Sequence, residues 1–278
     1  MQTPNAASGE GSRRVTGMDV ELFTQGSGQP VLFLHPGDGL DPHAAYVERL
    51  ARRHRVLAPS HPGFGSSPLP EHFTSVDDLA YFYLDLMKAH DLEDAVVVGV
   101  SFGAWIAAAI AIKSVERIAG LILVDSLGAK FADRTTREIG DLFSVNIHEQ
   151  ASLIYHDPDR RAPSFADTSH EALTRLARSH ETFALFAWSP TLHDPKLAHR
   201  LHRISVPTLV VWGREDRVVS LDYGREFASR IPGAHFTVID GAGHDPHLEQ
   251  PDRFDEVVER FIEELPAPSA RRAAHPGS

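Results

Sequence analysis

The amino-acid sequence predicts an α/β fold, a doubly wound and mostly parallel sheet with an inserted helical cap. Short β-branched runs recur along the chain, and each is followed by a turn and then by a helical pattern. This alternation is typical of parallel strands with helices on both faces of the sheet. This alternation of strand and helix patterns stops between residues 127 and 203, where only helical patterns remain. We therefore expect one α/β core that is interrupted by one helical cap.

The expected strands are the apolar runs between turn residues. A leading strand that ends in a hairpin-like turn spans 19–30, and further strands start with VLFLHPG at 31, RVLAPS at 55, DAVVVGVS at 94, IAGLILVDS at 118, PTLVVWG at 207 and HFTVID at 235. Helices are expected at 43–53, 75–90, 102–113, 220–230 and 251–264, and in the cap at TTREIGDLFSV and EALTRLARSHETFALFAW. The predicted core comprises 15–126 and 204–266, the cap 127–203, and disordered polar tails 1–14 and 267–278.

Composition narrows the class of partner and of chemistry. The 278 residues include 27 Lys and Arg against 38 Asp and Glu, so the formal charge is −11 and a nucleic-acid backbone would be repelled. The absence of cysteine excludes disulfides, thiolate metal sites and a cysteine nucleophile. The amino-terminal stretch lacks the apolar core of a secretion signal, and no apolar run reaches the roughly 18 residues of a membrane span. We expect a cytoplasmic protein with no membrane or nucleic-acid partner.

The segment DAVVVGVSFGAW carries a GxSxG motif. It places Ser101 between Gly99 and Gly103, with a strand pattern before it and an alanine-rich helical pattern after it, which is the context of a nucleophile elbow. The sharp turn strains the backbone of the serine, and side chains two residues away on either side would collide with the neighbouring strand or helix. The motif alone also fits a serine in an ordinary turn.

A serine hydroxyl becomes a strong nucleophile only when a base takes its proton. His244 lies in a glycine-rich loop after the last strand run, at the same edge of the sheet as Ser101, and Asp216 follows the preceding strand run. The chain order Ser, Asp, His matches a catalytic triad on an open α/β sheet. Asp125, which ends the run LILVDS, is the alternative carboxylate.

Residues 18–265 resemble the α/β-hydrolase superfamily, in its capped serine hydrolase subgroup. The motifs are LHPG at 34, HPGFGSS at 61, GVSFG at 99, GREDRVV at 213 and GAGHDPHLEQP at 241. The resemblance implies that Ser101 is the nucleophile, that His244 is the general base and then the acid, and that Asp216 orients the imidazole.

The resemblance also implies an oxyanion hole made of two backbone amides. These map onto Phe102 and Gly37, with Asp38 as the alternative to Gly37, because Pro36 has no amide hydrogen to donate. His35 would organise this loop, and His61 would sit in a turn where relatives often have aspartate. The side chains predicted to line a substrate pocket are Asp38, Phe143, Phe183, Phe186 and Trp188, and packing within the cap is the alternative for each aromatic ring.

Metal and nucleotide sites are not expected. The pair His244 and His247 has an intervening proline and lacks the spacing of helical metal ligands, and the glycine patterns complete neither GxGxxG nor a P-loop. We therefore expect no metal and no cofactor.

A serine nucleophile implies acyl-enzyme chemistry and excludes dehalogenases and epoxide hydrolases, which use aspartate. The leading prediction is hydrolysis of a small carboxylic ester, or of a lactone or amide, through an acyl-enzyme on Ser101, with peroxide replacing water as a side activity. Carbon–carbon bond hydrolases of aromatic-ring degradation typically have asparagine before the serine and tryptophan after the histidine, whereas this chain has Val100 and Asp245. They are the second interpretation, and a ligand-binding receptor-like module is the third. The expected partner is a small molecule with an apolar acyl or alcohol part. The sequence does not decide whether the protein forms a homodimer.

Overall fold

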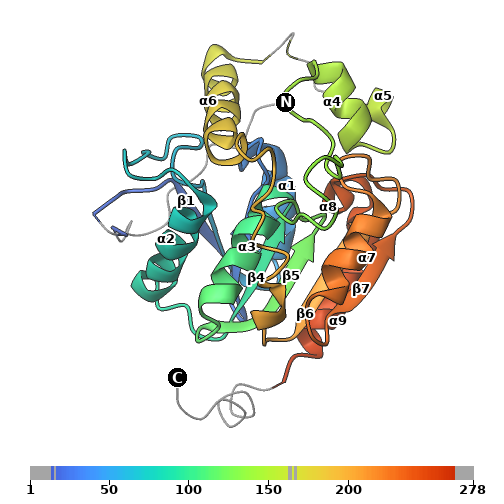
Figure 1. Cartoon of the computed structure of the whole chain (residues 1–278). Coiled ribbons are helices and arrows are strands. Elements are labelled where there is room, and N and C mark those ends of the chain that lie inside the picture. Colours follow the sequence, from blue (N-terminus) through green and yellow to red (C-terminus); the bar gives the residue numbers. More distant parts are fainter. Residues whose placement is uncertain (1–13, 16, 162–164, 166–167, 267–278) are drawn as a thin grey trace.

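The computed structural model describes residues 14–15, 17–161, 165 and 168–266 (Figure 1). The predicted tails at 1–14 and 267–278 lie outside these residues, apart from Arg14. A seven-stranded sheet has the order β1-β3-β2-β4-β5-β6-β7, and every neighbouring pair is parallel except β1 and β3. The predicted mostly parallel sheet is confirmed. Its strands are β1 (Leu22–Gln25), β2 (Pro30–Leu34), β3 (Arg55–Pro59), β4 (Ala95–Val100), β5 (Ile118–Val124), β6 (Thr208–Gly213) and β7 (His235–Ile239).

The leading strand does not pair with the strand that follows it. β1 runs antiparallel to β3, which lies between β1 and β2. The expected turn does connect β1 to β2, and Gly26 in it has a φ of 86°. A Cβ atom there would lie 2.0 Å from the carbonyl oxygen of His54, just before β3, so the turn can approach this backbone only with glycine at position 26.

Helices cover both faces of the sheet (Figure 1). Successive side chains of a strand point to opposite faces, so Leu32 and Leu34 join one apolar core while Val31 and Phe33 join the other. The first core is covered by α2, α3 and α7, and the second by α1 and α9. The helices of the core are η1 (Asp41–His43), α1 (Ala44–Leu50), α2 (Val76–Ala89), α3 (Phe102–Lys113), η2 (Leu201–Arg203), α7 (Leu221–Ser229), α8 (Pro246–Glu249) and α9 (Pro251–Glu263). Within the described part of the chain, none of the helices has the length and apolarity needed to cross a bilayer.

The segment between β5 and η2 combines helices with irregular chain and lies beyond one end of the strands (Figure 1). It contains α4 (Ile147–Ile154), α5 (Pro158–Arg161) and α6 (His170–Ala187). We call this segment the insertion. It corresponds in position to the expected cap.

The first predicted helix of the insertion, TTREIGDLFSV, is wrong. Its aspartates close turns instead: Asp133 accepts hydrogen bonds from the amides of Thr135 and Thr136, and the amide of Phe143 donates to Asp141 at 3.0 Å. These local bonds compete with the helical pattern and use the amides that a helix would need. The segment is therefore an irregular chain that reaches the core.

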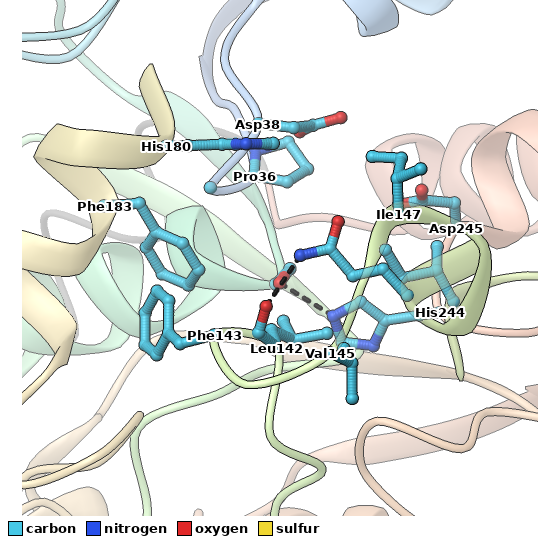
Figure 2. A pocket seen from close by; sticks show the side chains of 14 residues that line it. Pro36, Asp38, Leu142, Phe143, Val145, Ile147, His180, Phe183, His244 and Asp245 are labelled. Atoms are coloured by element: carbon cyan, nitrogen blue, oxygen red, sulfur yellow. Dashed lines mark hydrogen bonds between the residues drawn. The ribbon is translucent and has the colours of Figure 1, made fainter. Parts of the chain in front are cut away.

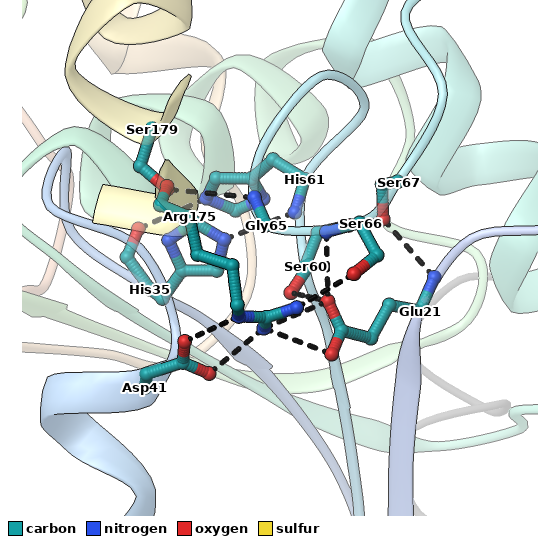
Figure 3. A network of polar contacts seen from close by, with 10 residues as sticks. All are labelled: Glu21, His35, Asp41, Ser60, His61, Gly65, Ser66, Ser67, Arg175 and Ser179. Carbon is teal, nitrogen blue, oxygen red and sulfur yellow. Dashed lines mark hydrogen bonds and ion pairs between the residues drawn. The ribbon is translucent and has the colours of Figure 1, made fainter. Parts of the chain in front are cut away.

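Helix α6 is tied to the core by the half-buried guanidinium of Arg175 (Figure 3). Arg175 donates to both carboxylate oxygens of Glu21, at 2.9 and 3.0 Å, and to Asp41 at 2.8 Å. Its third nitrogen donates to the hydroxyl of Ser66 at 2.6 Å. One side chain thus ties α6 to β1, to η1 and to the loop after β3.

Candidate active site

Ser101 occupies the strained turn that joins β4 to α3. Its φ is 54° and its ψ is −113°, values that an L residue adopts only when its surroundings enforce them. A Cβ atom on Gly99 would lie 2.4 Å from the carbonyl oxygen of Gly103. The flanking glycines therefore have the steric purpose that the motif predicts, and the turn exposes the serine hydroxyl to a cavity.

His244 connects Ser101 to Asp216 through two hydrogen bonds. Its Nε2 lies 2.7 Å from Ser101 Oγ, and its Nδ1 lies 2.8 Å from Asp216 Oδ2. The other carboxylate oxygen of Asp216 accepts from the amides of Val218 and Val219, at 2.7 and 3.1 Å. The structure therefore brings the three predicted side chains, all buried, into one chain of hydrogen bonds.

The loop that carries His244 is anchored by the insertion. The backbone amide of His244 donates to the carbonyl oxygen of Ile154, the last residue of α4, at 2.6 Å. Glu249 accepts hydrogen bonds from the amides of Gly243 and His156, and so joins the same loop to the chain after α4. The imidazole is thus positioned by the core and by the insertion together.

Electrostatics favour proton acceptance by His244. Burial alone would lower the pKa of His244, but the charge and the hydrogen bond of Asp216 raise that pKa above its usual 6.5. An imidazolium formed next to Asp216 is stabilised in the same way. The arrangement can therefore take a proton from the serine hydroxyl and later return it to a leaving group.

Asp125, the alternative carboxylate, lies close to this chain but is not hydrogen-bonded to the imidazole. It directly follows β5 with a φ of 43°, and its Oδ1 accepts from the amide of Gly213 at 2.9 Å. Of the two aspartates, Asp216 is the one that contacts His244 Nδ1.

The residues predicted to form an oxyanion hole, Phe102 and Gly37, lie next to Ser101 in the chain and in the cavity wall, respectively. Phe102 is the first residue of α3, where an amide has no acceptor inside the helix. Gly37 lines the same cavity as Ser101, and the amide of Gly39 closes the turn after Pro36 by donating to the carbonyl oxygen of Pro36 at 3.3 Å. The side chain of Asp38, the alternative donor residue, binds His43 at 3.0 Å. The oxyanion role of Phe102 and Gly37 stays a prediction.

Two stacked histidines, visible in Figure 3, support the loop before Gly37. His61 Nε2 donates to the carbonyl oxygen of His35 at 2.9 Å, and the amide of His61 donates to His35 Nε2 at 2.9 Å. His61 Nδ1 is bound by the hydroxyl of Tyr83. Burial lowers the pKa of His35 to about 4 and that of His61 well below 6.5, so both rings are neutral. His35 bonds within this loop, in line with the expected organising role. His61 lies in the expected turn and also supports the loop. Nothing in the sequence indicated that Tyr83 would bind His61.

The cavity over Ser101 has a volume of about 310 Å³. Asp38, Phe143 and Phe183 line it as predicted, and the two rings lie on the side away from His244 (Figure 2). Phe186 and Trp188 do not line it, contrary to the prediction. Phe186 faces the ring of Phe102 inside the core, and Trp188 lies past the end of α6 with 60% of its surface exposed.

Several lining residues escaped sequence reasoning. His180 lies three residues before Phe183 on α6, so the helical spacing could have found it. Gln150 comes from α4, whose start is marked by the capping box of Asn146 and Glu149. The missed lining residues are Pro36, Leu142, Val145, Ile147, Gln150, Ile154, His180 and Asp245.

The cavity wall carries acidic side chains. The residues found around it include the carboxyl groups of Asp38 and Asp245 and no lysine or arginine. Burial raises the pKa of Asp245 to about 6. His247 is turned away from Ser101 and bonds to His43, with 2.8 Å between the ring nitrogens.

Comparisons with known proteins agree with this geometry. Residues 31–257 match the model of the Alpha/beta hydrolase family. The 2-hydroxymuconate semialdehyde hydrolase of Pseudomonas putida is 29% identical over 262 residues, which are 90% of this chain and 93% of that protein. The structure of a meta-cleavage product hydrolase from Pseudomonas fluorescens IP01 is 25% identical with a TM-score of 0.74, over 90% of this chain and 96% of that one. A thermophilic esterase from Thermogutta terrifontis is 26% identical with a TM-score of 0.73, over 89% and 94%. The chain belongs to the alpha/beta hydrolase family.

Proposed function

We propose that the protein hydrolyses a bond next to a carbonyl carbon of a small molecule, with Ser101 as nucleophile. The observation that carries this proposal is the hydrogen-bond chain from Ser101 Oγ through His244 to Asp216, which opens into the cavity. His244 takes the hydroxyl proton while Ser101 attacks the carbonyl carbon, and the amides of Phe102 and Gly37 bind the negative oxygen. His244 then protonates the leaving group, and a water that it activates hydrolyses the acyl-enzyme.

The first candidate for the bond is a carbon–carbon bond of the ring-cleavage type. This ranking reverses the order expected from the sequence, because the hydrolases that are similar over 90% of the chain act, by their names, on 2-hydroxymuconate semialdehyde and on meta-cleavage products. In such a substrate the 2-hydroxy enol must first become a ketone, by transfer of its hydroxyl proton to the carbon beside the reacting carbonyl. That carbon can then depart as an enolate conjugated to the new ketone, and His244 would supply the proton that neutralises it.

Ester hydrolysis is the second candidate, and the cavity wall favours it. A ring-cleavage acid carries a carboxylate, whereas the lining offers two aspartates and no lysine or arginine to pair with it. Val100 and Asp245 stand where the ring-cleavage hydrolases typically have asparagine and tryptophan. The similarity to the Thermogutta terrifontis esterase supports the same candidate.

A direct comparison of two substrates tests the ranking. The purified chain is assayed with 2-hydroxymuconate semialdehyde and with p-nitrophenyl acetate, and kcat/KM is measured for both, with Ser101→Ala as the control. The proposal expects a larger kcat/KM for the semialdehyde, while a larger value for the ester makes the protein an esterase. If the chain turns over neither substrate and an organophosphonate does not label Ser101, the hydrolase proposal fails. The ligand-binding module is then the interpretation that remains.

A further inference from the structure

Asp125 lies against the carboxylate of the triad in a buried site. Its Oδ1 accepts from the amide of Gly213, whereas its buried Oδ2 has no hydrogen-bond partner among the residues that the structure describes. One carboxyl oxygen of Asp125, one of Asp216 and a ring nitrogen of His244 all lie within 4.8 Å of one another. Two carboxyl groups therefore share one site from which water is excluded, and both are 6% exposed or less.

Two carboxylates in such a site cannot both be ionised, because their charges repel one another at low dielectric. Asp216 accepts hydrogen bonds from two amides and from His244, and each of these stabilises its charge. Within the described part of the chain, Asp125 accepts one, from Gly213. Burial, and then the charge of Asp216, raise the pKa of Asp125 well above 3.8, and Asp245 adds to this rise while the Gly213 amide opposes it. The contacts therefore favour a proton on Asp125 and a charge on Asp216.

We propose that Asp125 is a neutral carboxylic acid at neutral pH and that its Oδ2–H group donates a hydrogen bond to the carboxylate of Asp216. Asp125 is then a positioning residue, which acts on the triad through Asp216. The bond gives a partner to the orphaned Oδ2 and holds Asp216 toward His244. It also spreads the negative charge of Asp216, which limits how strongly Asp216 stabilises the imidazolium. The proposal concerns the triad alone, so it does not depend on which substrate the protein hydrolyses.

Two substitutions separate a neutral donor from a charged carboxylate. Asp125→Asn keeps a donor toward Asp216 and an acceptor for Gly213, so the rate at which an organophosphonate labels Ser101 should stay within about threefold of wild type. Asp125→Leu is close in size but has no donor, and labelling should slow by about tenfold or more. Without the donated bond the charge of Asp216 is less dispersed, so the acid limb of the labelling rate in Asp125→Leu should move to higher pH.

The direction of the pH shift in Asp125→Asn decides the proposal. If Asp125 were ionised, asparagine would remove a negative charge next to His244, lower the pKa of His244 and move the acid limb to lower pH, which would overturn the proposal. An unmoved limb supports it. Infrared difference spectroscopy of wild type against Asp125→Asn at pH 8 gives a second readout that needs no turnover. A protonated carboxyl C=O band that is lost in the variant supports the proposal, and its absence from wild type overturns it, even if Asp125→Leu does not fold.

Discussion

A Cβ atom on Gly103 would lie 2.1 Å from the carbonyl oxygen of Leu34, the last residue of β2. Helix α3 therefore starts in direct contact with the backbone of the strand that leads into the Gly37 loop. This contact fixes the start of the helix, and with it Ser101, relative to the oxyanion loop. Backbone atoms cannot yield as the end of a flexible side chain can, so the contact has a measurable consequence.

We expect Gly103→Ala to destabilise the protein by at least about 2 kcal/mol, because the added methyl group must displace α3 or β2. Thermal unfolding followed by circular dichroism measures the change. Ala109→Ser, later in the same helix and only half-buried, is the matched control and should cost about 0.5 kcal/mol. Equal stability of Gly103→Ala and wild type would show that the two elements can separate without loss.

Asp216→Asn should lower kcat by about 10³-fold or more, because an amide neither fixes the correct imidazole tautomer nor stabilises the imidazolium. The measurement is steady-state turnover of the better of the two substrates, beside Asp125→Asn, which should lose far less. The opposite ranking would transfer the role of triad carboxylate to Asp125.

The pH dependence of kcat/KM should show an acid limb with a midpoint above 6.5. His244 must be neutral to accept the serine proton, and Asp216 holds the pKa of His244 above its usual value despite burial. Activity is therefore lost as the pH falls through that raised pKa. In Asp216→Asn the limb should move to lower pH, and a rate that stays flat down to pH 5 would exclude His244 as the base.

Arg175→Met should loosen α6 while leaving the triad in place. The guanidinium is 19% exposed and is shared by Glu21 and Asp41, so its loss should lower the free energy of unfolding by about 1 kcal/mol and expose α6 to limited proteolysis. Arg137→Met is the control, because Arg137 is 70% exposed and pairs with Asp141 inside the insertion. Identical cleavage rates in the two variants would mean that α6 is held by its apolar face instead.

The sequence predicted the sheet and the triad because both depend on local signals. Short continuous apolar runs mark strands that are buried on both faces. The glycines around Ser101 reflect a steric requirement of the turn itself. The pocket depends on how α6 is rotated, which its sequence leaves open: Phe183 faces the cavity, whereas Phe186 turns into the core. TTREIGDLFSV does not form the predicted helix, because the turns closed by Asp133 and Asp141 outweigh its helical spacing of apolar residues.

The hydrogen bond from the His244 amide to the carbonyl of Ile154 joins the catalytic base to one particular wall of the cavity. Replacing residues of α4 to enlarge that wall will also shift the imidazole. A wider range of substrates will therefore come with slower turnover. The opposite wall, at Phe183, has no such link to the base. Redesign for a bulkier substrate should therefore begin there.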